Sequence, residues 1–106
     1  MITVRFFGEA PCKGFYASGH AGMAPQGQDL VCAAVSALTQ GALFALKHYQ
    51  VSFRYRQEDE NGVLCCLVRE TQNGKVQTAD VVLTAALQGL LAVESQFPQC
   101  LRVIPR

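Results

Sequence analysis

The sequence carries little charge: Asp, Glu, Lys and Arg make up 16% of its 106 residues, and the formal net charge is +1. This balance gives no support to a strongly basic nucleic-acid binder, so we expect no direct nucleic-acid binding. The chain also lacks an uninterrupted apolar run of the ~18–20 residues that cross a membrane. Its N-terminus lacks the basic-then-apolar order of a signal peptide. These absences predict no membrane partner and a cytoplasmic location.

Paired cysteines are also missing. The cysteine count is odd, and no Cys-x-x-Cys motif occurs. Cys65 and Cys66 are adjacent, which makes them a poor chelating pair for a metal ion. We therefore expect no metal site, no disulfide framework and no cofactor. In a reducing compartment, most of these residues are expected to be small buried hydrophobes. The cysteines are Cys12, Cys32, Cys65, Cys66 and Cys100.

The length fits one domain over residues 1–106, and half of the residues are apolar, which is enough for a packed core. Alternating apolar runs between turn residues predict five strands. With two helices between them in the order ββαββαβ, they indicate an α+β fold with a mixed or antiparallel sheet and both helices on one face. The predicted strands are Ile2–Phe7, Cys12–Ser18, Ser52–Gln57, Val63–Val68 and Leu101–Ile104.

Helix signals occur twice. Asp29 is a good N-cap for a helix over residues 30–47, and Thr78 or Asp80 could cap a second helix that ends near Gln96. Gly89 within the second helix indicates a close contact, because glycine there costs about 1 kcal/mol relative to alanine. Helical spacing predicts two core stripes: Val31, Val35, Leu38, Ala42 and Ala45, then Val82, Ala86, Gly89, Val93 and Phe97.

Residues 18–36 carry the clearest chemical pattern, a histidine and a cysteine separated by a short loop. A cysteine nucleophile needs a lowered pKa and a nearby base. With Asp29 as the N-cap, Cys32 takes the third helical position, where free N–H groups and the macrodipole favour an anion by about 0.3–1 kcal/mol. Those N–H groups could also receive an oxyanion. His20 could act as the base, and Ser36 lies one turn beyond Cys32 on the same helix face.

The loop between them, Gly19–Gln28, contains Gly19, Gly22 and Gly27, which permit close backbone approach and hinge-like motion. We expect it to close over bound substrate. A simpler interpretation also fits. A cysteine in a helix rich in alanine and valine is often buried filler, and a histidine after a strand is often a turn residue. His48, near a helix C-terminus, is interpreted as structural.

Several fixed positions occur together in this segment: Gly19-His20-Ala21, Gly27, Asp29-Leu30-Val31-Cys32-Ala33 and Ser36-Ala37, with twelve residues from His20 to Cys32. This pattern resembles the signature of Prp, the ribosomal-processing cysteine protease family. The resemblance implies a homodimeric α+β fold and a cytoplasmic cysteine endopeptidase that removes the short N-terminal extension of a large-subunit ribosomal protein. It also implies Cys32 as nucleophile, His20 as base, and Asp29 and Ser36 as supporting residues. Met23 departs from the tyrosine that many relatives carry nearby.

Two hypotheses follow. The first is the endopeptidase, and the alternative is a non-catalytic ribosome-assembly or protein-binding factor in which this segment only docks a partner. Alkylation at neutral pH separates them, because a reactive, exposed thiolate at Cys32 should be labelled ahead of the other four cysteines. The uncovered sheet face further predicts a homodimer, with the apolar strand Val63–Val68 as its candidate contact.

Overall fold

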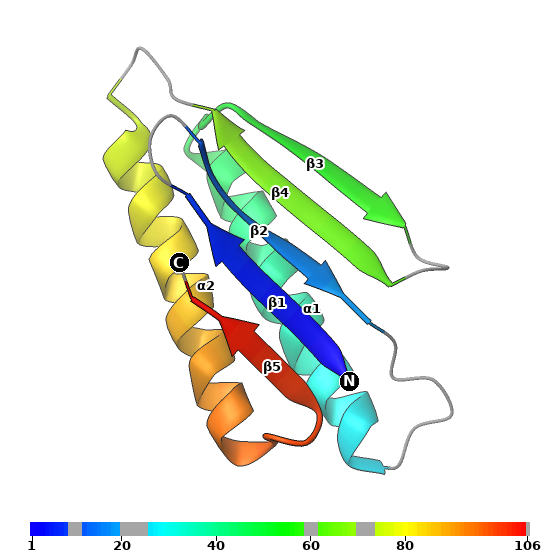
Figure 1. The fold of residues 1–106 in the computed structure, drawn as a ribbon. Coiled ribbons are helices and arrows are strands. Elements are labelled where there is room, and N and C mark those ends of the chain that lie inside the picture. The colour runs from blue at the N-terminus through cyan, green and yellow to red at the C-terminus, as the bar shows by residue number, and fades with distance from the viewer. Residues whose placement is uncertain (9–11, 20–25, 59–61, 70–73, 106) are drawn as a thin grey trace.

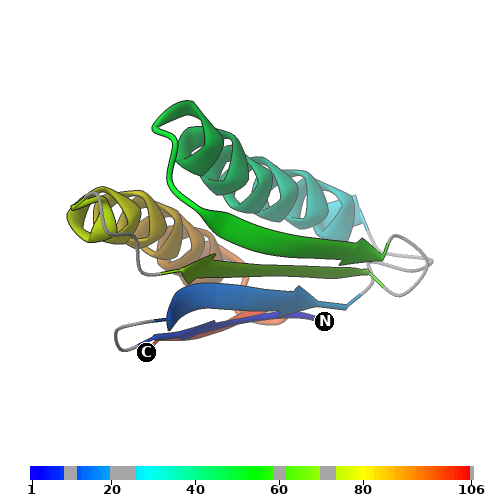
Figure 2. The same cartoon turned by 90° about the horizontal axis from the view of Figure 1, so that it is seen from above.

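The computed structural model describes residues 1–8, 12–19, 26–58, 62–69 and 74–105. In this part of the chain, a five-stranded mixed sheet has the order β3-β4-β2-β1-β5, with both helices on one face (Figures 1 and 2). β5 runs parallel to β1, and the other neighbours are antiparallel. The predicted α+β fold is confirmed. The elements are β1 (Ile2–Phe7), β2 (Cys12–Ser18), α1 (Gln26–His48), β3 (Phe53–Glu58), β4 (Val63–Arg69), α2 (Val76–Gln96) and β5 (Leu101–Ile104).

The strands alternate between side chains that face the helices and side chains that face away, as in a sheet covered on one side. In β1, Ile2, Val4 and Phe6 are buried, whereas Arg5 between them is exposed. β4 and β5 follow the same period of two. The sheet side of the core is completed by Phe15, Ala17, Leu64, Cys66, Val68, Leu101 and Val103.

Helix α1 buries much of its predicted stripe, namely Val31, Val35 and Ala42. Leu46 rather than Ala45 completes it at the C-terminal end, where the larger side chain fills the core. Leu38 is partly buried and contacts α2 at Gly89. A Cβ atom on Gly89 of α2 would lie 2.8 Å from Leu38 Cδ2. The close contact predicted at Gly89 is therefore present, and it lets the two helices approach each other.

Helix α2 begins earlier than predicted, at Val76, and Lys75 at its N-cap makes no side-chain capping bond. Thr78 and Asp80 therefore lie inside the helix, and the prediction that either one caps it was wrong. Asp80 instead forms an ion pair with Lys13 of β2 at 3.0 Å. The buried face of α2 differs from the predicted stripe. The helix is apolar on several sides, so the spacing of its apolar residues does not select one face. The buried residues are Ala79, Leu83, Ala86, Leu87 and Leu90.

Two helical segments, Leu30–His48 and Val76–Gln96, are long and apolar enough to cross a membrane by length and composition alone. The expectation drawn from uninterrupted apolar runs missed them, because scattered polar residues break the runs without lowering the mean hydropathy below 1.5. Core helices of soluble proteins pass the same test. Here both helices lie with one side against the sheet (Figure 2), and 28% of each apolar segment is buried.

Candidate active site

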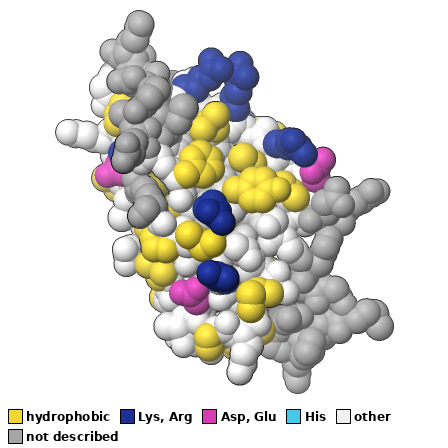
Figure 3. All heavy atoms as spheres, viewed as in Figure 1, with side chains coloured by type: hydrophobic (Ala, Val, Ile, Leu, Met, Phe, Trp, Pro, Cys, Tyr) yellow, Lys and Arg dark blue, Asp and Glu magenta, His cyan; other side chains and the backbone are white. Residues whose placement is uncertain are grey.

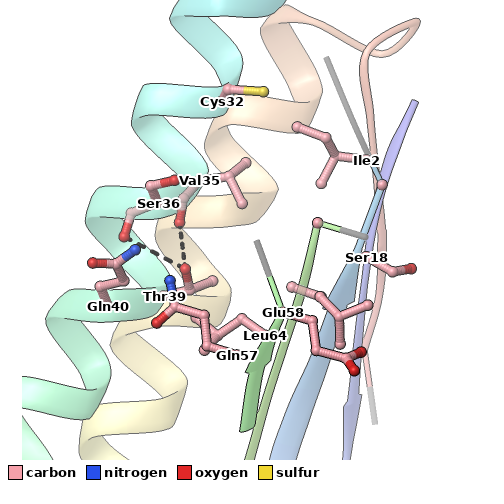
Figure 4. A pocket seen from close by; sticks show the side chains of 14 residues that line it. Ile2, Ser18, Cys32, Val35, Ser36, Thr39, Gln40, Gln57, Glu58 and Leu64 are labelled. Atoms are coloured by element: carbon pink, nitrogen blue, oxygen red, sulfur yellow. Dashed lines mark hydrogen bonds between the residues drawn. The ribbon is translucent and has the colours of Figure 1, made fainter. Parts of the chain in front are cut away.

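Cys32 lies on a cleft between α1 and one end of the sheet (Figure 4). The cleft has a volume of about 200 Å³. Its floor comes from the start of β1 and β4 and the end of β2, and its far wall comes from the end of β3. Cys32 is partly buried there, and it is the described cysteine that lines the cleft. The lining residues are Ile2, Ala17, Ser18, Gly19, Cys32, Val35, Ser36, Thr39, Gln40, Gln57, Glu58, Gly62, Val63 and Leu64.

The helix side of the cleft is built by residues about one turn apart. Cys32, Ser36 and Gln40 follow each other at intervals of four, so they lie along one face of α1. Ser36 is exposed, as a residue that meets a substrate should be. Thr39 is buried, and its hydroxyl donates to the carbonyl oxygen of Val35 at 2.8 Å. This bond uses the single O–H of Thr39 within the helix, so among the described residues of α1 that line this cleft, Ser36 and Gln40 have polar side chains available to a ligand.

The helix that carries Cys32 begins at Gln26, three residues before the predicted cap. Asp29 is therefore inside the first turns of α1, and Gly27 and Gln28 are helical rather than part of a loop. The presence of Asp29 could not show whether the helix begins at Gln26 or after Asp29, because an acidic residue is favoured both at the N-cap and in the first turn. Pro25, which precedes the helix in sequence, and the helix-forming glutamines favour the earlier start.

This earlier start weakens the dipole argument for Cys32. The free N–H groups belong to the first four helical residues. Cys32 is the seventh residue of α1, so its own N–H belongs to the helical ladder. The macrodipole effect falls off within the first turn. Activation of Cys32 as a nucleophile would therefore depend mainly on a nearby base rather than on the helix dipole.

Gly19 lines the same cleft and is bonded directly to His20. His20 and Gly22 themselves lie outside the described residues. Gly19 has a φ of +121°, and a Cβ atom there would collide with the carbonyl oxygen of Met1. Glycine is thus required where the chain leaves β2 against the start of β1. Cys32 on α1 and Gly19, the residue before His20, therefore line the same cleft.

A second hollow of about 190 Å³ continues from this cleft between α1 and the edge strand β3. The two hollows share Gln40 and Gln57. Phe44 and Tyr55 at its rim are 70% and 63% exposed. Sequence reasoning missed this extension, although the four-residue spacing of Cys32 and Ser36 continues to Gln40 and Phe44. The hollow is lined by Gln40, Leu43, Phe44, Lys47, Phe53, Tyr55 and Gln57.

The other described cysteines have different surroundings. Cys66 is fully buried in the core, and burial, with a smaller effect of Cys65, raises the pKa of its thiol to about 12. Cys65 and Cys100 are partly buried, and Cys32, Cys65, Cys66 and Cys100 are all free thiols. The side chain of Cys12 is not described. Among the described residues, no three His, Cys, Asp or Glu side chains gather where they could hold a metal ion.

Comparison with known protein families settles the broad class. The family model of the cysteine protease Prp matches residues 1–102. The chain belongs to the cysteine protease Prp family. As a member of the Prp family it is a cysteine protease, and the cleft that holds Cys32 is its candidate active site.

Solved structures share the fold of this Prp family member. An essential ribosomal processing protease Prp from S. aureus, in complex with a substrate peptide, is 22% identical with a TM-score of 0.82, and the match covers all of both chains. The same protease with a covalently linked product peptide is 24% identical with a TM-score of 0.81, again over both full chains. SMU.848 from Streptococcus mutans is 20% identical with a TM-score of 0.78, over all of this chain and 96% of the other. The search of curated proteins gives no match.

Proposed function

We propose that this cysteine protease removes the short N-terminal extension of a large-subunit ribosomal protein, with Cys32 as nucleophile and His20 as base. The observation that carries the proposal is the shared cleft, which places Cys32 opposite Gly19, the residue bonded to His20. Support for the substrate comes from the S. aureus relative, which is described as a ribosomal processing protease.

The proposed reaction uses the two residues in sequence. His20 takes the proton of the Cys32 thiol, and the thiolate attacks the scissile carbonyl carbon. When the carbon–nitrogen bond breaks, the imidazolium gives the proton to the leaving amine and a thioester to Cys32 remains. Water then hydrolyses the thioester, which releases the new carboxylate and restores the thiol. Ser36, which is exposed one turn along the helix, would hydrogen-bond the substrate in this mechanism.

The hollow beside β3 suits the substrate residues next to the scissile bond. β3 is at the edge of the described sheet, so one side of its backbone has no partner among the described strands. An extended peptide can pair with such an edge. Phe44 and Tyr55 would then contact apolar or aromatic side chains that precede the cut, which are the residues implied by the resemblance.

Replacing Phe44 with alanine should raise the KM for a peptide with an aromatic residue before the cut about tenfold, with little change in kcat. The lost apolar contact is made equally in the ground state and the transition state, and tenfold corresponds to about 1.4 kcal/mol. Steady-state kinetics on a fluorogenic peptide measure it. Val81→Ala on α2, where Val81 is 68% exposed, is the matched control. A normal KM in Phe44→Ala would remove this hollow from the substrate site.

The proposed role of His20 as the base can be tested with His48, the second histidine of the chain, as the control. His20→Ala should slow cleavage of the extended ribosomal protein by about 100- to 10,000-fold, the range that a general base contributes. His48 is exposed near the end of α1 and stacks edge-on against Tyr49 at 4.9 Å, so His48→Ala should cleave at the wild-type rate. Mass spectrometry of the product at timed intervals gives both rates. Equal rates in the two variants would contradict the dyad.

We further propose that the protease acts in the cytoplasm as a homodimer. The strand proposed earlier as the contact, Val63–Val68, sends alternate residues into the core and the others to the open sheet face. That face also carries Arg5, Arg54 and Arg56, and pairing it with its own copy across a two-fold axis would oppose like charges, so we expect the dimer contact on another surface of the chain. Light scattering should give twice the chain mass of 11.5 kDa. A monomer mass at micromolar concentration would contradict the homodimer.

A further inference from the structure

The arginines are distributed over the fold very unevenly. Each described arginine lies on a strand, is exposed, and points away from the helices. The strand registers establish this direction. Arg5 and Arg102 alternate with buried neighbours on β1 and β5, and Arg69 does so on β4. On β3, Arg54 and Arg56 pair with Leu67 and Cys65, which are on the same outer side of β4. The arginine face is defined by Arg5, Arg54, Arg56, Arg69 and Arg102, and Figure 3 views it directly.

The lysines are elsewhere. Lys13 points to the helix side of the sheet, where it pairs with Asp80, and Lys47 and Lys75 lie on and next to the helices. The described strands contain one acidic residue, Glu58, whose carboxylate accepts from Arg56 at 3.0 Å. Glu94 of α2 also reaches β5, where its carboxylate accepts from the Val103 N–H at 2.6 Å. The five arginines thus exceed the described acidic residues at this face, Glu58 and Glu94, by three. The net charge of +1 conceals this surplus, because it averages the face with acidic residues in the rest of the chain.

An aromatic ring stands among these charges. Tyr16 is on β2, the central strand, and is 43% exposed on the arginine face. Its register partners are Arg5 on β1 and Cys65 on β4, and Arg56 is the next residue in the same row on β3. Arg5 is on the strand next to Tyr16, about 4.8 Å away between backbones, whereas Arg56 is two strands from Tyr16, with Cys65 between them. Figure 3 shows apolar and basic side chains mixed across this face.

We propose that the arginine face binds single-stranded RNA, with guanidinium groups on the phosphates and Tyr16 stacked on a base. An open sheet with exposed aromatic rings is a general platform for unstacked bases. Arginine suits phosphates because its planar fork donates two parallel hydrogen bonds and also stacks on bases. An acidic protein segment would satisfy the charges but would leave Tyr16 without a stacking partner. The arginine face is on the opposite side of the sheet from the Cys32 cleft, so both can be occupied together.

The experiment is fluorescence anisotropy of a labelled twelve-nucleotide RNA of mixed sequence, titrated with the full chain in 50 mM salt. We expect binding. The logarithm of the association constant should fall linearly with the logarithm of the salt concentration, with a slope of about −3, as for four to five phosphates neutralised on a single strand. Arg54→Gln combined with Arg102→Gln should weaken binding about tenfold or more and reduce the slope by about 1.4. The matched control, Lys47→Gln with Lys75→Gln, removes the same charge from the helix side and should change the affinity less than twofold.

Tyr16→Leu separates stacking from charge. It should weaken RNA binding about tenfold while leaving the salt slope unchanged. The proposal is overturned if the RNA does not bind at 50 mM salt, or if the lysine variant loses as much affinity as the arginine variant. It is also overturned if a polyglutamate peptide binds with the same dependence on Tyr16, since an acidic protein partner would then account for the face.

RNA binding by the arginine face and peptide cleavage at the Cys32 cleft can be tested separately. The Cys32→Ser variant should bind RNA with wild-type affinity, because Cys32 is on the other side of the sheet. The Arg54→Gln and Arg102→Gln variant should hydrolyse a short peptide at the wild-type rate. A loss of peptide hydrolysis in that variant would mean that the arginines belong to the substrate site, which contradicts a separate RNA surface.

Discussion

Replacing Cys32 with serine is expected to lower the rate of cleavage by about 10,000-fold or more, the scale on which loss of a catalytic nucleophile acts. A serine hydroxyl has a pKa far above that of a thiol, so serine would not supply the thiolate that the proposed mechanism requires. The fold should be unaffected, because Cys32 is only partly buried and the substitution is nearly isosteric. Cleavage is followed by mass spectrometry of the extended ribosomal protein over hours.

The matched control is Cys65→Ser. Cys65 is also a partly buried free thiol, but it lies on β4 on the outer side of the sheet. Its variant should cleave at the wild-type rate and unfold at the same denaturant concentration. Full cleavage by purified Cys32→Ser would refute Cys32 as the nucleophile, and it would favour the alternative in which this segment docks a partner without chemistry.

The largest effect on stability is expected from Gly14→Ala. Gly14 is on β2 between β1 and β4, and a Cβ atom there would collide with the backbone carbonyl oxygen of Cys66. That oxygen belongs to a paired strand and can move only with the sheet. We expect the free energy of unfolding to fall by about 3 kcal/mol or more. This corresponds to a lower Tm by about 12–20 °C in a chain of this size.

The control is another glycine-to-alanine change. Gly41 is exposed within α1, and nothing lies within 4 Å of a Cβ atom built there. Alanine should raise the free energy of unfolding by about 0.5–1 kcal/mol through its higher helix propensity. Urea unfolding followed by circular dichroism measures both variants. A Gly14→Ala protein as stable as the wild type would show that β2 and β4 are not packed as described.

Much of the fold was predictable from sequence because strand and helix periods are local properties. The alternation in residues 2–7 predicted both the strand and its buried side, since one face of the sheet is covered. Residues 63–68 are all apolar, so their strand was predictable but its buried side was not. The buried side of α2 was not predictable. Its apolar residues surround most of the helix, and packing against the sheet rather than spacing selects Leu83, Leu87 and Leu90.

The site was predictable only in part. The spacing of His20 and Cys32 and the family signature pointed to the cysteine, but the start of α1 at Gln26 depends on residues that also suit a loop. The wall formed by Gln57 depends on how β3 and α1 meet, which no local pattern encodes. The arginine face was hidden for a similar reason: Arg5 and Arg56 are far apart in sequence and meet only through the pairing of four strands.

The central claim, that Cys32 is the activated nucleophile, is tested most directly by measuring the alkylation rate of each cysteine. The intact protein is treated with iodoacetamide at pH 7, and labelled peptides are quantified by mass spectrometry over time. Cys32 should react at least about ten times faster than Cys65 and Cys100, because reactivity follows thiolate fraction and exposure. Cys66 should react last and remain slow up to pH 9, since its pKa is raised to about 12 and its thiol stays protonated below that value.

The His20→Ala variant completes this measurement. Without the base, the rate at Cys32 should fall toward that of Cys65, while labelling in denaturant should be equal at all cysteines in both proteins. Fast labelling of Cys32 that disappears in His20→Ala is the result that the account predicts. Labelling of Cys32 no faster than that of Cys65 and Cys100 in the wild type would contradict it.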